Sequence, residues 1–380
     1  MDNPFIYGKV ARGEYFADRE SEIQELLSDI AASQSVIIFS PRRYGKTSLI
    51  FEVLDRARQK GFLGLYLDLF RVTSKEAFVS AYAREIARLY QGGARSVLRK
   101  LKELLPRLIP KVVLKDDRTD VEWEFEFDVR GEKIPLIEDL FEAVAKIGAR
   151  QGKRAVVVFD EFQEIIKWDA GNQIERQMRS HFQMHGEVSY IFMGSKRHLM
   201  QDLFQNKNRP FYRFGKHFPL GKIPEGDLSE FIRTRFDRTG FRIEPGTIEE
   251  ILKVTEHHPY YTQLFCSVIW EAKRSEQVIS ESDIRQGVHE VLTRESHAFH
   301  DLWDVLPFKA RQLLVAFARE AGESKQIYSD IFLKKYNLGS ASSVQRALER
   351  IQREEILEKI NGEYKFGDVF FKRWILVNFL

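Results

Sequence analysis

A short apolar run that leads directly into a basic loop constrains this chain more than any other feature. Residues 35–39 read SVIIF, and residues 40–47 read SPRRYGKT. The run is short and apolar enough for a strand that is buried in a sheet. A helical pattern begins at Lys46, immediately after the loop. A buried strand joined to a helix in this way favours an α/β architecture.

The loop has the length and the ending of a phosphate-binding loop: four residues, then Gly45, Lys46 and Thr47. Backbone N–H groups of such a loop, and the positive end of the helix after it, face the phosphates. Lys46 is expected to reach the β and γ phosphates of ATP or ADP, and the Thr47 hydroxyl to ligate Mg²⁺. Ser40 stands where the pattern has glycine, and a basic strand-to-helix turn without a ligand is the alternative. The residues expected to hold the nucleotide here are Ser40, Pro41, Arg42, Arg43, Tyr44, Gly45, Lys46, Thr47 and Ser48.

A second apolar run, VVVFDEF at 156–162, ends in two acidic residues. Asp160 is predicted to hold the magnesium ion through water, and Glu161 to orient and deprotonate an attacking water. Adjacent acids at the end of a strand also occur where a helix simply begins, because the helix N-terminus favours negative charge. The phosphate-binding loop upstream favours the catalytic interpretation.

The segment Gly194-Ser195-Lys196-Arg197 follows a third apolar run and supplies polar side chains at another strand end. Ser195 or Arg197 is predicted to lie beside the γ-phosphate. For Lys196, a solvated strand end is nearly as good an interpretation.

Apolar runs and helical patterns alternate through the first 220 residues, which is typical of a parallel sheet covered by helices. Residues 92–134 interrupt the alternation with a basic helix at 96–110 and a hairpin around Asp116–Asp117, and we interpret them as an insertion. The candidate strands besides 35–39 are 63–69, 154–160, 188–194 and 216–220.

Strand signals nearly vanish after Gly221, and the remainder predicts two further domains. Residues 221–298 read as several short helices, a helical lid. Residues 299–380 contain three helical segments and then EKINGEYKF, a strong hairpin signal around Asn361–Gly362. Three helices and a hairpin predict a winged helix-turn-helix. The first domain accordingly covers residues 1–220.

The third helix of the winged unit could contact duplex DNA. Val344, Ala347, Leu348 and Ile351 form its expected inward face, and the predicted outward face has serine, glutamine and arginine residues able to touch phosphates and base edges. Glutamates interrupt that face, and the net charge of the whole chain is only +3, so any nucleic-acid surface is local. Duplex DNA bound through residues 340–373 and a protein partner docked on the same unit are both open.

Several ordered motifs together resemble a known family. NPF and FADRE near the N-terminus, PRRYGKTSL, VVVFDEFQEI and FMGSKRHLM are similar to the archaeal-type P-loop ATPases of the AAA+ and STAND group, relatives of the archaeal origin-recognition ATPases. The resemblance spans nearly the whole chain. It implies a five-stranded parallel sheet of order 5-1-4-3-2, a helical lid and a C-terminal winged helix.

The resemblance also implies roles for single residues. Arg19 is expected to lie against the adenine, and Pro259 to belong to a lid segment that senses the nucleotide. Arg209 or Arg213 could serve as an arginine finger in an oligomer. The alternative is surface arginines packed on neighbouring aromatic rings.

The predicted function is an ATP-binding and ATP-hydrolysing molecular switch. The rivals are a DNA-associated oligomeric motor or loader and a nucleotide-gated interaction protein that does not hydrolyse ATP. A small-molecule kinase is a distant third. The single cysteine, Cys266, excludes an intrachain disulfide, residues 1–16 have no apolar signal core, and no apolar stretch approaches membrane-spanning length, so a cytoplasmic location is expected.

Overall fold

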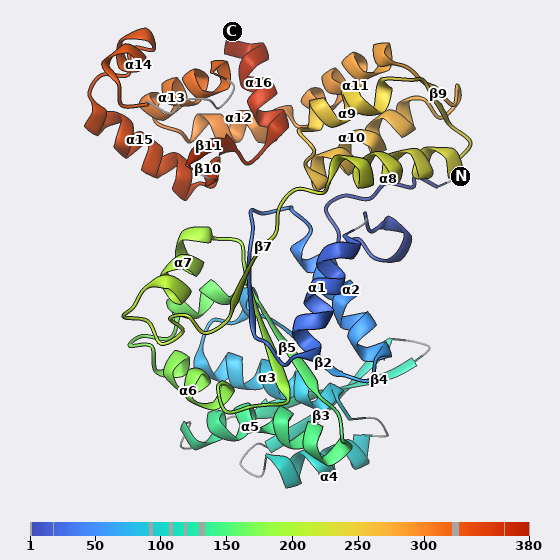
Figure 1. Cartoon of the computed structure of the whole chain (residues 1–380), viewed down its shortest axis with the longest axis vertical. Coiled ribbons are helices and arrows are strands. Elements are labelled where there is room, and N and C mark those ends of the chain that lie inside the picture. The colour runs from blue at the N-terminus through green and yellow to red at the C-terminus, as the bar shows by residue number, and fades with distance from the viewer. Residues whose placement is uncertain are drawn as a thin grey trace. The chain divides into compact units, whose positions relative to one another are not determined.

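The computed structural model describes residues 2–17, 19–90, 94–105, 109–117, 120–128, 134–320, 327–360 and 362–379 (Figure 1). The chain forms two compact units. We call Arg19–Ser40 with Gly45–Gly221 the sheet unit. We call Met1–Asp18, Pro41–Tyr44 and Lys222–Leu380 together the helical unit.

The sheet unit is built on a five-stranded parallel sheet of order β2-β5-β6-β1-β7. Numbered along the chain, the strands follow the order 2-3-4-1-5, which is the predicted 5-1-4-3-2 read from the other edge. β5 and β6 are buried along their whole length, as expected for central strands covered on both faces. The five strands are β1 (Val36–Phe39), β2 (Leu63–Asp68), β5 (Ala155–Asp160), β6 (Val188–Gly194) and β7 (Lys216–Pro219).

Helices with one apolar face cover this sheet. In α1, for example, Ile23, Leu26, Leu27 and Ile30 are buried at helical spacing, as the sequence predicts. Stacked rings such as Phe159 and Phe192, whose centroids lie 5.6 Å apart, fill the interior. The helices are α1 (Glu20–Ala31), α2 (Lys46–Gln59), α3 (Lys75–Arg88), α4 (Ala94–Leu104), α5 (Ile134–Gln151), α6 (Gln173–Phe182) and α7 (Arg197–Gln205), with short 3₁₀ turns at Leu69–Arg71 and Phe162–Lys167.

The strand register brings the predicted site residues to one edge of the sheet. Phe39 at the end of β1 pairs with Gly194 at the end of β6. Asp160 at the end of β5 pairs with Asp68 at the end of β2. Because the strands are parallel, the residues that follow them emerge at the same edge, where open α/β sheets bind ligands.

The insertion contains the predicted hairpin, formed by β3 (Ile109–Asp117) and β4 (Asp120–Asp128) in antiparallel pairing. The predicted helix 96–110 is too long, since α4 ends at Leu104 and residues 109–110 belong to β3. The residue before Pro106 is disfavoured in helical conformation, which explains an end near this point. Residues 92–93, 106–108, 118–119 and 129–133 of the insertion lie outside the described part of the chain.

The helical unit contains two groups of helices. The first is α8 (Glu225–Arg238), α9 (Thr247–Thr255), α10 (Pro259–Ala272) and α11 (Glu281–Arg294), with a small parallel pair, β8 (Arg242–Ile243) and β9 (Val278–Ile279), that the sequence analysis did not predict. The second is α12 (Ser296–Asp304), α13 (Phe308–Arg319), α14 (Asp330–Lys335), α15 (Ala341–Arg353), the hairpin of β10 (Leu357–Ile360) and β11 (Glu363–Phe366), and α16 (Val369–Phe379). Asn361 of the predicted turn lies outside the described residues. None of the described helices is long and apolar enough to cross a membrane.

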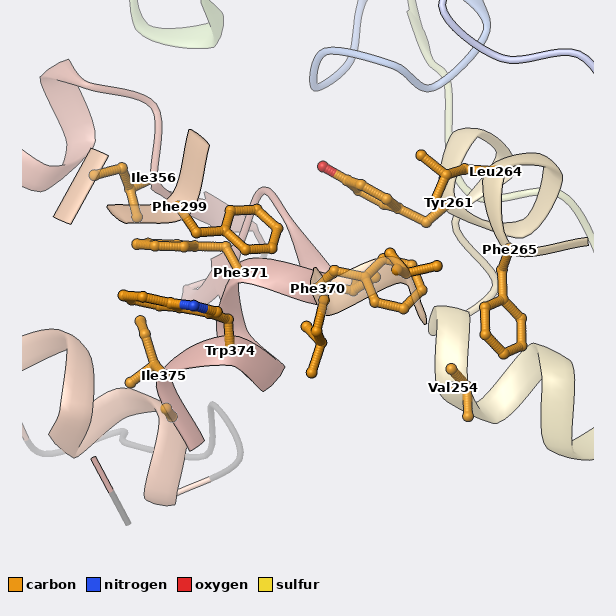
Figure 2. Packing of buried hydrophobic residues seen from close by; sticks show 14 of the residues in the cluster. Val254, Tyr261, Leu264, Phe265, Phe299, Ile356, Phe370, Phe371, Trp374 and Ile375 are labelled. Atoms are coloured by element: carbon orange, nitrogen blue, oxygen red, sulfur yellow. The ribbon is translucent and has the colours of Figure 1, made fainter. Parts of the chain in front are cut away.

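Aromatic side chains of α16 join the two groups into one core (Figure 2). The ring of Phe370 lies 5.8 Å from Phe265 of α10 and 5.9 Å from Tyr261. On the other side, Phe371 stacks on Trp374 and contacts Phe299 of α12. The final helix of the winged unit is therefore packed directly on α10.

Candidate nucleotide site

The phosphate-binding loop has the backbone that a tight strand-to-helix turn requires. Gly45 precedes α2 with φ of 83°, a left-handed conformation that glycine adopts without steric cost. The Lys46 side chain is buried, and its ammonium donates a 2.8 Å hydrogen bond to the backbone carbonyl of Ser40. The Lys46 side chain thus connects the start of α2 to Ser40, the first residue of the loop. Ser40 is also buried.

Asp160 is the central acceptor of the second element. Its Oδ2 accepts hydrogen bonds from the Tyr66 hydroxyl at 2.5 Å and the Thr47 hydroxyl at 3.2 Å. Its Oδ1 accepts from the backbone N–H of Glu161 at 2.9 Å. The carboxylate and the Thr47 hydroxyl are therefore adjacent, as the proposed metal site requires.

Burial raises the pKa of the Asp160 carboxyl above its ordinary value, and the neighbouring charge of Glu161 adds to this effect, while the Tyr66 hydrogen bond opposes it. A divalent cation at this position would offset the cost of burying the charge. Mg²⁺ prefers oxygen ligands and usually takes only one or two from the protein, with phosphates and water completing its shell. Thr47 and Asp160 fit that pattern, and bound Mg²⁺ would there neutralise phosphate charge.

The predicted base, Glu161, is held by two neighbours. The Ser195 hydroxyl donates a 2.8 Å hydrogen bond to Glu161 Oε2, and the Gln163 amide donates to the same oxygen. Glu161 itself adopts a left-handed backbone conformation, with φ of 49°. Such conformations are uncommon away from glycine and cluster at functional sites. The structure thus brings the side chains of Glu161 and Ser195 together, while the roles of both residues toward a nucleotide stay predictions.

Arg197 and Lys196 differ in their surroundings. The Arg197 guanidinium lies 5.4 Å from the ring centroid of Phe39, at the end of β1, and forms no ion pair with any described residue. Lys196 faces the buried carboxylate of Glu164 at 3.7 Å. Of the two cations, Arg197 is therefore the one available to an anionic ligand.

The four residues between Ser40 and Gly45 belong to the helical unit, where they contact both helix groups. Arg43 donates a 2.8 Å hydrogen bond to the Tyr261 hydroxyl of α10 and lies 4.5 Å from the ring centroid of Tyr260. The same guanidinium lies 3.6 Å from the Asp368 carboxylate, just before α16. Arg42 pairs at 2.6 Å with Glu355, between α15 and β10. We call Arg42, Arg43 and these partners the loop clasp.

The start of α10, beside the clasp, is buried. Pro259 is the first residue of α10, as expected for a helix-opening proline, and it is buried. His258 is also buried, against the rings of Tyr44 and Tyr261. Burial, aided by the positive charges of Lys222 and Arg43, lowers the pKa of His258 to about 3, so the imidazole is neutral at physiological pH.

Arg19 is buried within the sheet unit. Its guanidinium pairs with Glu22 at 2.7 Å and donates to the backbone carbonyl of Gly221 at 2.9 Å. The side chain therefore ties the start of α1 to the end of this unit. Contact of Arg19 with an adenine stays a prediction.

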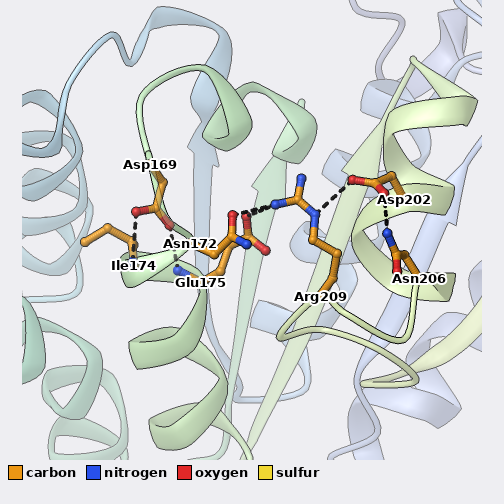
Figure 3. Close-up of polar contacts among 7 residues, drawn as sticks. All are labelled: Asp169, Asn172, Ile174, Glu175, Asp202, Asn206 and Arg209. Atoms are coloured by element: carbon orange, nitrogen blue, oxygen red, sulfur yellow. Dashed lines mark hydrogen bonds and ion pairs between the residues drawn. The ribbon is translucent and has the colours of Figure 1, made fainter.

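Arg209 is held by a network of polar contacts inside the sheet unit (Figure 3). Its guanidinium contacts Asp202 at 2.9 Å, Asn172 at 2.5 Å and Glu175 at 3.2 Å. Glu175 is fully buried, and this raises the pKa of its carboxyl to about 7 despite the opposing charge of Arg209. Arg209 is therefore engaged within its own chain, and a role as an arginine finger stays a prediction.

Arg213 matches the alternative drawn from the sequence, since its guanidinium lies 5.3 Å from the ring centroid of Tyr212.

In the winged unit, α15 buries the four predicted apolar residues and exposes Arg346, Arg350 and Arg353. Arg350 pairs with Glu354 at 2.8 Å.

Comparisons with known proteins agree with this geometry. Residues 16–218 match the model of a family described as "ATPase domain predominantly from Archaea", and residues 297–377 match one described as "Probable winged helix domain". The chain belongs to the archaeal ATPase family. An uncharacterized ATP-binding protein of Pyrococcus horikoshii is 28% identical to this chain over 231 residues, which cover 57% of this chain and 65% of that relative, just under two thirds.

Solved structures share the fold of this chain. A Walker-type ATPase of Pyrococcus abyssi superimposes with a TM-score of 0.66 at 16% identity, covering 96% of this chain and 97% of the other. The ORC2 protein of Aeropyrum pernix, in a structure of ADPNP–ADP complexes, gives 0.55 at 14% identity, covering 99% and 97%. Together with the family matches, these comparisons confirm the predicted P-loop ATPase fold with a C-terminal winged helix.

Tyr66 and Gln163 are two further residues of the candidate site that were not predicted from the sequence. Tyr66 reaches Asp160 only because β2 and β5 are neighbours in the sheet, a pairing that no local pattern reveals. Gln163 follows Glu161 by two residues, and its side chain is buried beside Gly194, where a larger residue would overlap it. The sequence offered one signal for Gln163, a polar residue two positions after the acidic pair Asp160–Glu161.

Proposed function

We propose that this chain is a molecular switch that binds and slowly hydrolyses ATP and relays its nucleotide state to a helical lid, formed by α8 to α11, and to the winged helix. The loop clasp is the observation that carries the proposal. Arg42 and Arg43 belong to the phosphate-binding loop by sequence, yet their side chains contact α10, Glu355 and Asp368. A rearrangement of the loop on nucleotide exchange would therefore change these contacts.

The clasp is suited to switching because each of its contacts contributes only a small free energy. The side chains of Arg42 and Arg43 are about half exposed, 58% and 49%, and exposed ion pairs contribute little to stability. A ligand that binds one loop conformation better than the other can therefore shift the equilibrium. The packing of Phe370 against α10 would carry the change onward within the helical unit.

Slow turnover is supported by the surroundings of Glu161. Its Oε2 accepts from both Ser195 and Gln163, so one of the two oxygens is engaged before any water is bound. This arrangement also favours the second candidate, a nucleotide-gated binder without hydrolysis. Steady-state ATPase measurement with Mg²⁺ separates the two candidates.

Calorimetry tests the nucleotide site itself. Lys46→Ala removes the cation aimed at the phosphates and should abolish most of the affinity for ATP. Lys60→Ala is the matched control, because Lys60 lies at the other end of α2 and is exposed. Equal ATP affinity in the two variants would contradict the proposed phosphate site.

Duplex DNA is the proposed partner of the winged helix, through residues 340–373. Arg346 and Arg353 are exposed on α15 and form no ion pair with any described residue, which leaves them available to phosphates. Replacing both by alanine should weaken duplex binding and flatten its salt dependence. If the intact chain binds no duplex at low salt with ATP or ADP, a protein partner takes the place of DNA in the proposal. Oligomer formation is a separate proposal that solution mass would test.

A further inference from the structure

A large basic pocket lies in the sheet unit, apart from the predicted site residues of the phosphate-binding loop, and the proposed function does not use it. Its volume is about 1510 Å³, and it is lined by β2, α2, α3, α4 and the end of α5. Pockets for single small molecules are typically about 300 to 1,000 Å³. β2 is an edge strand of the sheet, so this pocket opens beside the sheet rather than within it.

The charge of the pocket is unusual for this chain. Its described lining residues include seven cationic and three acidic side chains, a net charge of four positive. The entire chain carries a net charge of only +3. Cationic side chains that line the same pocket repel one another and raise the positive potential of the pocket. Both effects favour binding of an anionic ligand.

Some of these cations are already paired. Arg58 faces Asp55 at 3.0 Å, Arg71 faces Asp68 at 3.8 Å, and Arg88 pairs with Glu85. Lys100, Arg150 and Lys153 form no ion pair with any residue that the structure describes. These three come from α4, the end of α5 and the turn after it.

The segment that carries two of the unpaired cations is closely packed. The backbone N–H of Lys153 donates a 3.0 Å hydrogen bond to the carbonyl of Gly148. A Cβ atom at Gly148 would lie only 2.6 Å from the carbonyl oxygen of Lys153, so this close approach requires glycine. The backbone around Arg150 and Lys153 is therefore held in place before any ligand binds.

Aromatic rings line the same pocket. Phe51, Phe62, Tyr66 and Tyr90 are all lining residues that are only partly buried. Lys100 lies 5.3 Å from the ring centroid of Tyr90, so a free cation and a ring are adjacent. Sites for single-stranded nucleic acids combine these two kinds of group. The cations bind the phosphates, and the aromatic rings stack on the bases.

We propose that this pocket binds a short segment of single-stranded nucleic acid, with Lys100, Arg150 and Lys153 on the phosphates and Tyr90 beneath a base. An acidic peptide would satisfy the cations but would gain less from the rings. The proposal is independent of ATP hydrolysis and of the winged helix.

Fluorescence anisotropy with a labelled oligothymidylate and the full chain tests the proposal. The triple variant Lys100→Ala, Arg150→Ala, Lys153→Ala should bind the strand about tenfold or more weakly, with a salt slope reduced by about 0.7 for each phosphate that is no longer neutralised. The control variant Arg176→Ala, Lys207→Ala removes two exposed cations of α6 and of the segment after α7, and it should bind normally.

Tyr90→Leu distinguishes a strand from a generic anion. It keeps apolar packing but removes the ring, so it should weaken binding of oligothymidylate while leaving binding of an oligoglutamate of equal charge unaffected. Thermal melting of each variant confirms that it is folded. The proposal is overturned if the wild type does not bind the strand at low salt, if pocket and control variants lose affinity equally, or if oligoglutamate binds as tightly as the strand.

Discussion

The Ser195 hydroxyl donates a 2.8 Å hydrogen bond to Glu161 Oε2, joining the end of β6 to the residue that follows β5. The two side chains are 34 residues apart in sequence. They meet because β5 and β6 are parallel neighbours whose carboxyl ends lie at one edge. Ser195, the proposed γ-phosphate contact, thus positions Glu161, the proposed base.

Glu161→Gln tests the role of this carboxylate. The substitution keeps size and shape but removes the proposed base, while the proposed ligands of Mg²⁺ and the triphosphate, Lys46, Thr47 and Asp160, are unchanged. Nucleotide affinity measured by calorimetry should survive, and single-turnover hydrolysis should slow by about 10²- to 10⁴-fold. Normal hydrolysis in this variant would mean that another group activates the water.

Glu175 predicts a specific dependence of stability on pH. Burial raises its pKa from 4.5 to about 7, so between these values the folded chain keeps a proton that the unfolded chain has released. The stabilisation from this group is therefore complete below pH 4.5 and is lost as the pH rises through 7, a change on the order of 3 kcal/mol. Thermal melting from about pH 5 to 8 should show that Glu175→Gln flattens this decline. An identical decline in the variant would assign it to other groups.

Arg209→Ala should destabilise the sheet unit. The substitution leaves the buried Glu175 and its neighbour Asp202 without their cation, a destabilisation on the order of 3 kcal/mol. Denaturant unfolding should detect it, with Arg213→Ala as the control, because the Arg213 side chain is exposed and packs on Tyr212. Unchanged stability in Arg209→Ala, together with abolished ATPase activity, would instead support an arginine finger.

Much of the architecture could be predicted from the sequence because it is encoded locally. The apolar runs, the Gly45-Lys46-Thr47 ending and the inward face of α15 each depend on short spacings. The sheet order came from the family resemblance. Contacts between distant segments had no such signal: Tyr66 with Asp160, and Arg209 with Glu175, depend on which elements lie side by side.

The loop clasp shows the same limit. Two arginines inside a phosphate-binding motif look like nucleotide ligands from the sequence. In the structure their side chains contact Tyr261, Glu355 and Asp368, far along the chain. Their spacing from Lys46 could not reveal these partners.

Hydrogen exchange of the winged unit tests the switch most directly. The Glu161→Gln chain saturated with ATP and Mg²⁺ should exchange the amides of α16 and the β10–β11 hairpin at a different rate from the wild type bound to ADP. Arg43→Ala removes the bond to Tyr261 and the pair with Asp368, so it should abolish that difference between nucleotide states. Lys60→Ala should preserve it. Identical exchange in the ATP and ADP states of chains with an intact clasp would contradict the account.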